Sequence, residues 1–419
     1  MRMRSLAIPA GIGILVAGYF FSTETFGSKL SQAVAHTFSA QARETQTSLT
    51  PIPGDTPEAQ LTQVFARIEQ NQLDLALQQA ETLTTKYPTF RLGQLVKGDL
   101  LLARSQPIST FGNAHNAPQD KLADLRDEAL ARLRAYRSQP PANAIPGYLL
   151  QLQADQKYAI VVDTQMSRLY LYQNDAGTPK LVSNYYITQG KLGADKFREG
   201  DQKTPLGVYR IVGNLQREKI GDFYGSGAWP LNYPNDWDRR MGRNGHGIWL
   251  HGVPSDTYSR PPKASNGCVV LSNPDLDAVA SHLQIGLTPV VIASSVDWLT
   301  PDEWKNERKD ILGAIDSWRR DWESRDGDRY ASHYAQSFNA DGINYATWTA
   351  QKRSVNASKA WIRVDTDKLT LFRYPGKDDM IVATFLQDYK SNNLNNTMMK
   401  RQYWQKENGQ WKIIYEGAA

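Results

Sequence analysis

The sequence predicts a multidomain α+β protein with an N-terminal α-helical region, a central β-rich domain and a C-terminal α+β domain. Three observations support this prediction. Apolar residues recur at helical spacing between positions 56 and 137. Short β-branched and aromatic runs, separated by polar turns, fill residues 157–293. After residue 300 a long amphipathic helix precedes several strands. With 419 residues, 41% of them hydrophobic, the chain is long enough for several cores.

The first 22 residues have the form of a secretory signal peptide. Residues 1–4 are basic, and an apolar run covers residues 6–21. This run is shorter than the ~20 residues that a membrane span needs, so cleaved export and a retained membrane anchor are both open. Residues 23–55 are rich in Ser, Thr and Gln and are expected to form a flexible tether. We therefore expect an exported protein of the periplasm or cell envelope.

Residues 56–150 are predicted to form a helical domain. Thr56 caps the first helix, Pro57 occupies its first turn, and a second helix ends before Pro88. With a third helix these resemble a single tetratricopeptide-like unit, whereas that architecture normally stacks at least three repeats. A small capping or partner-binding domain is therefore expected. The alternating charges of a fourth helix, residues 120–137, predict a solvated face.

Residues 151–298 are predicted to form the β-rich domain. The short-strand pattern fits a β-sandwich or barrel. A helix with Asn273 as its cap and Pro274 in its first turn is expected after the apolar residues 269–271. The strand-like runs are 157–163, 168–172, 184–188, 207–212 and 288–293.

Cys268 is the only cysteine of the chain, so no internal disulfide can form. Gly267 permits a sharp turn before it, and the apolar residues 269–271 predict a buried strand after it. His251 stands at the end of another predicted strand, one loop earlier. A histidine in reach of a thiol can take its proton and return it to a leaving amine. This arrangement predicts cysteine-dependent acyl transfer.

The groups around this pair have predictable roles. No acidic residue adjoins His251, so the carbonyl of Gly252 is expected to accept its Nδ1 proton. Backbone amides around Asn266, Gly267 and Cys268 are the expected oxyanion hole. A reactive thiol of this kind is expected to have a lowered pKa.

Other chemistries lack support in the sequence. His246 and His251 are not accompanied by a third ligand pattern, so we expect neither a metal nor a cofactor. The net charge is +5, but there is no basic stripe, Walker loop or G-x-G-x-x-G pattern. Nucleic-acid and nucleotide roles are therefore not expected.

From about Lys157 to Asp297 the chain resembles the catalytic domain of the L,D-transpeptidases, which act on the cell wall. The family pattern of H-G, a gap and S-x-G-C is matched by His251 and Gly252 followed by residues 265–268. Three further stretches, 200–209, 228–235 and 245–249, also match. The resemblance implies that Cys268 is the nucleophile, His251 the general base and acid, and Gly252 the orienting carbonyl, with Ser265 and Gly267 shaping the oxyanion turn.

One departure from the family concerns substrate binding. Many members carry an arginine two residues after the cysteine, where this chain has Val270. Arg260, in the loop between His251 and Cys268, is the preferred substitute for holding acidic or carbonyl groups; a solvated loop charge is the alternative. The matching motifs add three further candidate substrate-binding residues, Asn232, Tyr233 and Trp249.

Residues 299–419 are predicted to form a second α+β domain. A long helix comes first, with one apolar face made of Trp304, Ile311, Ile315, Trp318 and Trp322. Predicted strands follow at 360–364, 369–374, 380–389, 397–404 and 411–415. This order resembles the cone-like nuclear transport factor two-like fold, which implies a module that binds glycan, a partner protein or the wall.

The resemblances imply an enzyme acting on the stem tetrapeptides of peptidoglycan. Cys268 would attack the carbonyl between meso-diaminopimelate and the terminal D-Ala, and the acyl-enzyme would pass to an amine, as in an L,D-transpeptidase. The alternative is transfer to water, as in an L,D-carboxypeptidase that trims tetrapeptides to tripeptides. A third hypothesis is an inactive wall-binding scaffold. Expected partners are peptidoglycan stem peptides, and other cell-wall proteins through the helical and C-terminal domains.

Overall fold

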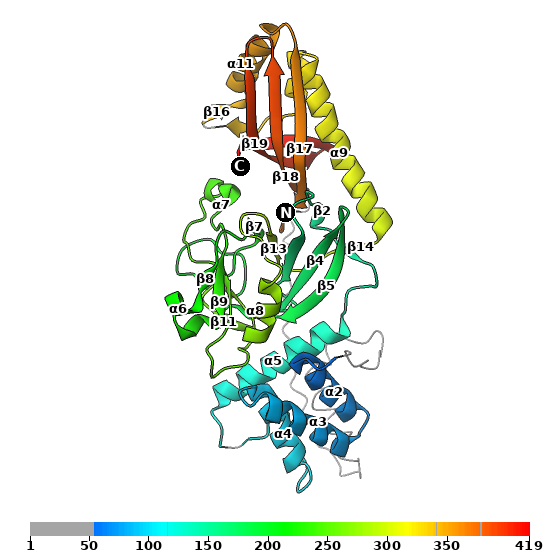
Figure 1. The fold of residues 1–419 in the computed structure, drawn as a ribbon, viewed down its shortest axis with the longest axis vertical. Helices are drawn as coiled ribbons and strands as arrows, with labels where there is room; N and C mark the ends of the chain where they lie inside the picture. Colours follow the sequence, from blue (N-terminus) through cyan, green and yellow to red (C-terminus); the bar gives the residue numbers. More distant parts are fainter. Residues whose placement is uncertain (1–53, 115, 341, 378) are drawn as a thin grey trace, which may run out of the picture.

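The computed structural model describes residues 54–114, 116–340, 342–377 and 379–419. The predicted signal peptide and nearly all of the tether lie outside these residues. The molecule is elongated, with the helical domain at one end, the β-rich domain in the middle and the C-terminal domain at the other end (Figure 1). The β-rich domain is called the catalytic domain below, after the resemblance found in its sequence. This mixed helical and strand content confirms the predicted multidomain α+β class. Every helix in the described part of the chain is too short or too polar to span a bilayer.

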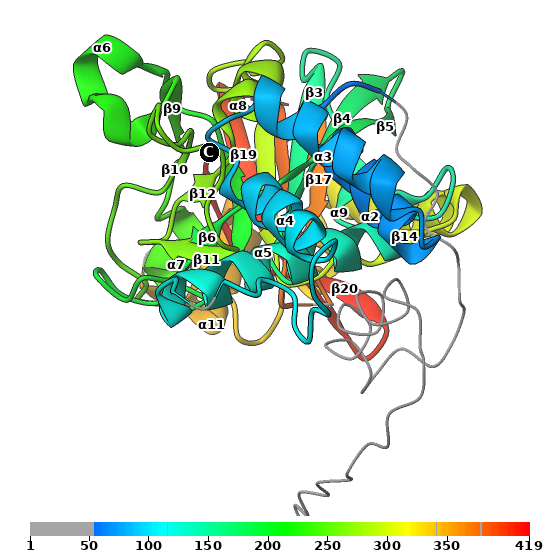
Figure 2. The ribbon, with the colours of Figure 1, turned by 90° about the horizontal axis from the view of Figure 1, so that it is seen from below.

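Four helices form the N-terminal domain and lie across one end of the catalytic domain (Figure 2). Thr56 caps the first of them by accepting a hydrogen bond from the N–H of Ala59. The predicted solvated face of the fourth helix is wrong for Glu128 and Arg132, which are both buried. The physical reason is their mutual ion pair, which Glu58 extends from the first helix. The helices are α2 (Pro57–Glu69), α3 (Leu73–Lys86), α4 (Arg91–Leu102) and α5 (Gln119–Arg137).

Two of the sheets in the catalytic domain enclose one core. The larger sheet has the order β5-β4-β3-β13-β7, and the smaller one has the order β12-β10-β9-β8. Ile160 and Leu171 of the first sheet share a core with Leu250 and Val269 of the second. The strands are β3 (Tyr158–Asp163), β4 (Arg168–Asp175), β5 (Thr178–Tyr186), β7 (Gly207–Arg210), β8 (Leu215–Gln216), β9 (Gly227–Pro230), β10 (Trp249–His251), β12 (Val269–Val270) and β13 (Pro289–Ala293).

Short elements complete this domain. Helix α8 is capped by Ser272, whose side chain accepts the N–H of Asp275, and not by Asn273 as predicted. Asn273 is instead the first residue of α8, and its side-chain amide bonds to the loop that follows His251. The short elements are β6 (Gln189–Gly190), α6 (Arg217–Ile220), η1 (Asp222–Tyr224), α7 (Asp236–Arg240), β11 (Lys263–Ser265) and α8 (Asn273–Ala280).

The C-terminal domain is a curved sheet with helices on one face, as the order of its elements predicted. All five residues of the predicted apolar face of α9 are buried. The two strands expected between 360 and 374 are one strand, β17, with an irregularity after Asp367 where Lys368 has a positive φ of 53°. The elements are α9 (Pro301–Glu323), α10 (Gly327–Ser332), β15 (Asn339–Ala340), β16 (Ile343–Asn344), α11 (Tyr345–Ala357), β17 (Ile362–Arg373), β18 (Met380–Ser391), β19 (Asn395–Glu407) and β20 (Gln410–Ala418).

The segment between the helical and catalytic domains contributes strands that the sequence did not predict. Strand β2 (Leu149–Gln151) pairs with β17 and forms an edge of the C-terminal sheet. Strand β1 (Ile145–Pro146) pairs with β14 (Trp298–Leu299), just before α9. The chain therefore contributes one strand to the C-terminal sheet before it forms the strands of the catalytic domain.

The catalytic and C-terminal domains share an apolar core. The face of the C-terminal sheet that points away from α9 carries Phe372, Val382 and Tyr403, and these pack with Val161 and Val291 of the catalytic sheet. Alternating residues on the same strands, such as Trp404, instead face α9. The two domains therefore pack against each other through a shared apolar core and are not separate units joined only by a linker.

Candidate active site

Two adjacent parallel strands bring Cys268 and His251 to the same part of the smaller sheet. Strands β10 and β12 pair with Leu250 opposite Val269 and His251 opposite Val270. Cys268 directly precedes β12, and Gly267 before it has a φ of +127°. A Cβ atom on Gly267 would lie 2.7 Å from the carbonyl oxygen of Lys203, so only glycine fits this turn.

His251 is buried and held in one orientation. Its Nδ1 lies 2.7 Å from the carbonyl oxygen of Gly252, the contact that the sequence predicted. A carbonyl can only accept, so Nδ1 carries the proton and Nε2 keeps its lone pair. Burial lowers the pKa of His251 to about 4, and the charge of Arg260 acts in the same direction, against the Gly252 hydrogen bond. At neutral pH the imidazole is therefore an uncharged base.

The amide of Asn273 braces the backbone that carries this carbonyl. Its Oδ1 accepts the N–H groups of Ser226 and Val253, each at 3.1 Å, and its Nδ2 donates to the carbonyl of Val253 at 2.9 Å. A Cβ atom on Gly252 would lie 2.1 Å from Oδ1 of Asn273, so the glycine makes room for the amide. Sequence reasoning assigned Asn273 to a helix cap and missed this role.

Cys268 is a thiol at rest, not a thiolate. Its Sγ donates to the carbonyl oxygen of Gly247 at 3.3 Å. Burial raises the pKa of the Cys268 thiol, although the N–H of Trp249 and the charges of Arg260 and Lys196 oppose this shift. The expected lowering of the thiol pKa is therefore wrong, because desolvation outweighs the nearby positive charge. The resting pair is a neutral thiol and a neutral imidazole.

Ser265 closes the turn that precedes the thiol. Its buried hydroxyl donates to the carbonyl oxygen of Cys268 at 2.7 Å and accepts the N–H of Gly267 at 3.1 Å. The amide of Gly267, one of the predicted oxyanion donors, is thus bonded to Ser265. The turn is rigid, with the exposed Asn266 at its tip.

Arg260 acts electrostatically on both Cys268 and His251. Its charge lowers the pKa of Cys268 and that of His251. Its guanidinium lies over the ring of Phe223, 4.7 Å from the centroid, and Tyr186 donates to its carbonyl oxygen at 2.9 Å. Phe223 itself is 56% exposed, so an aromatic surface and a cation adjoin the catalytic pair.

Helix η1 supplies aromatic residues that carried no signal in the sequence. The Tyr224 ring lies 5.1 Å from the His251 ring and 5.0 Å from that of Trp249. Trp249, a predicted substrate-binding residue, is partly exposed there. These rings form one wall beside His251.

Comparison with known proteins agrees with this geometry. A model of the L,D-transpeptidase catalytic domain matches residues 157–292, and a model of the Cds6 C-terminal NTF2-like domain matches residues 310–417. The solved structure of Bd1075 from Bdellovibrio bacteriovorus is 30% identical, with a TM-score of 0.58, over 66% of this chain and 98% of that chain. The chain belongs to the L,D-transpeptidase family. The resemblances to the L,D-transpeptidase catalytic domain and to the nuclear transport factor two-like fold are confirmed.

A second solved structure shares the fold of this member of the L,D-transpeptidase family. The helical cell shape determining protein Pgp2 from Campylobacter jejuni is 24% identical, with a TM-score of 0.56, over 65% of this chain and 95% of that chain. A search of the curated proteins finds no match.

The helical domain contacts the loop of the L,D-transpeptidase domain that carries Arg260. The ring of Tyr258 is buried in the core of the helical domain. The hydroxyl of Ser259 donates to the buried carboxylate of Glu128 at 2.6 Å. Two consecutive residues of this loop are therefore fixed by a different domain.

Two predicted substrate-binding residues of the L,D-transpeptidase domain lie elsewhere. Tyr233 is buried in the core, where its ring packs 6.0 Å from that of Tyr209 and its hydroxyl donates to the carbonyl of Asn244. Asn232 lines a cavity between the catalytic and C-terminal domains whose walls include neither Cys268 nor His251. Tyr233 thus contributes to the domain core and Asn232 to the wall of this cavity.

Proposed function

We propose that this protein is a peptidoglycan-modifying cysteine acyltransferase. The observation that carries the proposal is the hydrogen bond from Nδ1 of His251 to the carbonyl of Gly252. It leaves the lone pair of Nε2 free on the strand adjacent to β12, which Cys268 directly precedes. A neutral imidazole with a fixed tautomer is suited to take the thiol proton. Membership of the L,D-transpeptidase family supplies the substrate class.

The proposed reaction has two halves. His251 takes the thiol proton as Sγ of Cys268 attacks the carbonyl that links meso-diaminopimelate to D-Ala. The N–H groups of Asn266 and Cys268 stabilise the oxyanion. His251 returns the proton to the amine of D-Ala, which leaves, and a thioester remains on Cys268. An acceptor amine then attacks the thioester carbonyl and its proton passes to His251. The C–S bond breaks, the new amide leaves, and His251 returns the proton to the Cys268 thiolate.

Arg260 and the aromatic wall are proposed to bind the substrate. The stem peptide carries carboxylates, which a guanidinium holds by charge-assisted hydrogen bonds. Val270, which stands where many relatives have arginine, is buried and does not reach the surface. Arg260, in the loop between His251 and Cys268, thus takes the role of the arginine that many relatives carry at the position of Val270.

Water in place of the acceptor amine gives the alternative function, an L,D-carboxypeptidase.

We further propose that the protein acts in the cell envelope after export. A contribution to cell shape is part of the same proposal, because Pgp2, which shares the fold, is a helical cell shape determining protein. The helical and C-terminal domains would then bind the wall or its proteins.

Mass spectrometry of the full protein with a disaccharide-tetrapeptide tests the proposal. Cross-linked dimers that are absent with Cys268→Ala establish transpeptidation. Tripeptide and free D-Ala without dimers establish carboxypeptidation. Identical products from the two proteins, or none from either, would overturn the enzymatic function and leave the scaffold hypothesis.

A further inference from the structure

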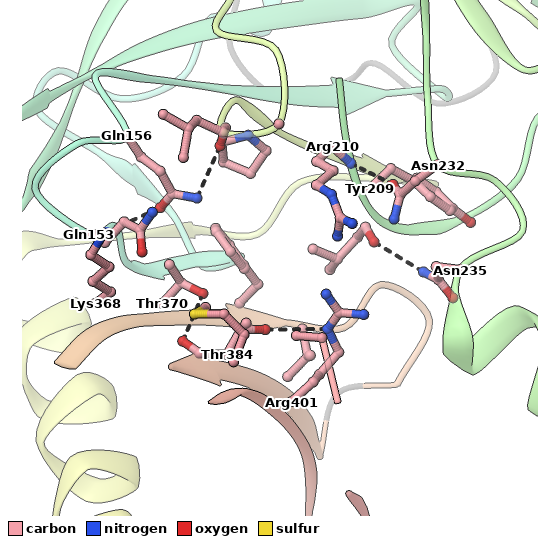
Figure 3. A pocket seen from close by; sticks show the side chains of 18 of the residues that line it. Gln153, Gln156, Tyr209, Arg210, Asn232, Asn235, Lys368, Thr370, Thr384 and Arg401 are labelled. Carbon is pink, nitrogen blue, oxygen red and sulfur yellow. Dashed lines mark hydrogen bonds between the residues drawn. The ribbon is translucent and has the colours of Figure 1, made fainter. Parts of the chain in front are cut away.

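A cavity of about 450 Å³ lies between the catalytic and C-terminal domains. Its volume is within the range of small-molecule sites, about 300–1,000 Å³. Figure 3 shows its polar lining, with Arg210 from β7 on one side and Arg401 from β19 on the other. Both guanidinium groups point into the space between the domains.

Arg210 has no counterion among the residues that the structure describes. Within the same residues, its side chain forms no hydrogen bond or ion pair. Burial lowers the pKa of Arg210, and the positive charge of Arg401 lowers it further, against a smaller opposing effect of Asp236. A half-buried guanidinium without a partner is unfavourable in the empty protein, because its lost hydration is not replaced.

Arg401 is only partly compensated. It pairs with Asp236, and its Nε donates to the hydroxyl of Thr384 at 3.3 Å. Asp236 also pairs with Arg239 at 2.9 Å. One carboxylate is therefore shared by two arginines, and neither of its ion pairs is with Arg210. At the far end of the cavity Lys368 is balanced by Asp155 at 3.7 Å. The uncompensated positive charge therefore lies at the end between Arg210 and Arg401.

Two asparagines adjoin the arginine at this end of the cavity. Oδ1 of Asn232 accepts the backbone N–H of Arg210 at 2.7 Å, so the Asn232 amide adjoins the arginine. The amide of Asn235 bonds to the carbonyl of Val208 at 3.0 Å and is fixed. Ala419 also lines the cavity, and among the described residues its carboxylate forms no ion pair with either arginine.

We propose that this cavity binds a short peptide through a free carboxylate held between Arg210 and Arg401. The planar fork of a guanidinium matches a carboxylate in a bidentate manner. Resting on the proposed function, the ligand would be a peptidoglycan stem peptide, which carries several carboxylates. Because the two arginines belong to different domains, the ligand bridges them, and the site is separate from Cys268.

Isothermal titration calorimetry of the full chain with the tripeptide L-Ala-γ-D-Glu-meso-diaminopimelate tests this site. A Cys268→Ala background removes turnover, and the active site then serves as an internal reference. We expect two binding events, one of which weakens at least about tenfold in Arg210→Gln and in Arg401→Gln, since a factor of ten is about 1.4 kcal/mol. Arg239→Gln, which removes an exposed arginine that shares Asp236, is the matched control and should keep both events.

Arg210→Lys separates the effect of the positive charge at position 210 from that of the planar guanidinium fork. It should bind more tightly than Arg210→Gln and more weakly than the parent, because lysine keeps the charge without the fork. Thermal unfolding checks that each variant folds. Unchanged binding in folded Arg210→Gln would overturn the site.

Inorganic phosphate and acetate are run as competitors. If either displaces the tripeptide at equal concentration, the cavity is a general anion site and the peptide assignment is wrong. Turnover of tetrapeptide by the Cys268 protein is measured separately, so failure of the proposed function appears there and not in these titrations.

Discussion

The ring of Tyr258 lies 4.4 Å from the ring of Phe90, so one side chain of a loop of the catalytic domain is buried in the core of the helical domain. Arg260 stands two residues further along the same loop, over Phe223 beside the catalytic pair. The helical domain and the proposed substrate-binding residue Arg260 are thus connected through three consecutive residues. The helical domain acts as a support for Arg260.

Tyr258→Ala should lower kcat/KM about tenfold or more, because the loop loses its anchor and Arg260 loses its fixed position. The effect should fall mainly on KM if Arg260 binds the ground state. Tyr258→Phe keeps the ring packing and should retain most activity. Steady-state kinetics with tetrapeptide measure both variants. Equal values for Tyr258→Ala and the parent would show that the loop holds its shape without the helical domain.

Arg260→Gln should raise the pKa of Cys268 and that of His251. The positive charge stabilises the thiolate and opposes the imidazolium, so its removal shifts both groups upward. The rate of alkylation by iodoacetamide against pH reports the thiol directly, since the chain has a single cysteine. The midpoint should move to higher pH. Lys263→Gln, an exposed residue of the same loop, is the control and should leave it unchanged.

The acidic limb of kcat/KM should lie near pH 4. His251 must be unprotonated to act as a base, and its pKa is lowered to about 4. Unfolding is linked to the same group. Between an unfolded pKa of about 6.5 and the folded value, only the unfolded chain binds the proton, so stability decreases as the pH drops through this window. An acidic limb near 6.5 would contradict a desolvated His251.

Asn273→Ala should reduce kcat more than it affects KM. Three hydrogen bonds to Ser226 and Val253 are lost, each contributing about 0.5–1.5 kcal/mol, and the carbonyl that orients His251 is released. Asn273→Asp keeps the acceptor and loses only the donor, so it should be less impaired. Kinetics and urea unfolding together separate orientation from stability. A pure stability loss with normal kcat would refute the bracing role.

Arg132→Met should destabilise the protein by about 3–5 kcal/mol, because breaking a buried ion pair leaves a buried carboxylate uncompensated. That group is Glu128, whereas Glu58 keeps its pair with Arg168 at 3.1 Å. The control is Arg104→Met, which removes an exposed pair with Asp74 and should cost about 0–1 kcal/mol. Urea denaturation of both variants measures the difference. Similar midpoints would show that the buried network is dispensable.

Local patterns predicted much of this molecule. The glycine, cysteine and apolar run around Cys268 and the histidine ending a strand are contiguous in sequence, and parallel pairing of β10 with β12 brings them together. The apolar face of α9 follows from helical periodicity alone. Charge at Glu128 and Arg132 suggested solvent, because their partner Glu58 lies on another helix. The thiol pKa was missed for the same reason, since desolvation depends on residues far away in the chain.

Strand β2 has a consequence for how the chain matures. The side chain of Gln151 on β2 donates to the carbonyl of Leu369, 218 positions later. At a synthesis rate of about 5–20 residues per second, that partner emerges on the order of 10–40 s after β2. Until Phe372, Val382 and Tyr403 have been made, the face of the catalytic sheet that carries Val161 and Val291 lacks the side chains that cover it. The apolar packing of the catalytic domain is therefore completed only by the last strands to be synthesised.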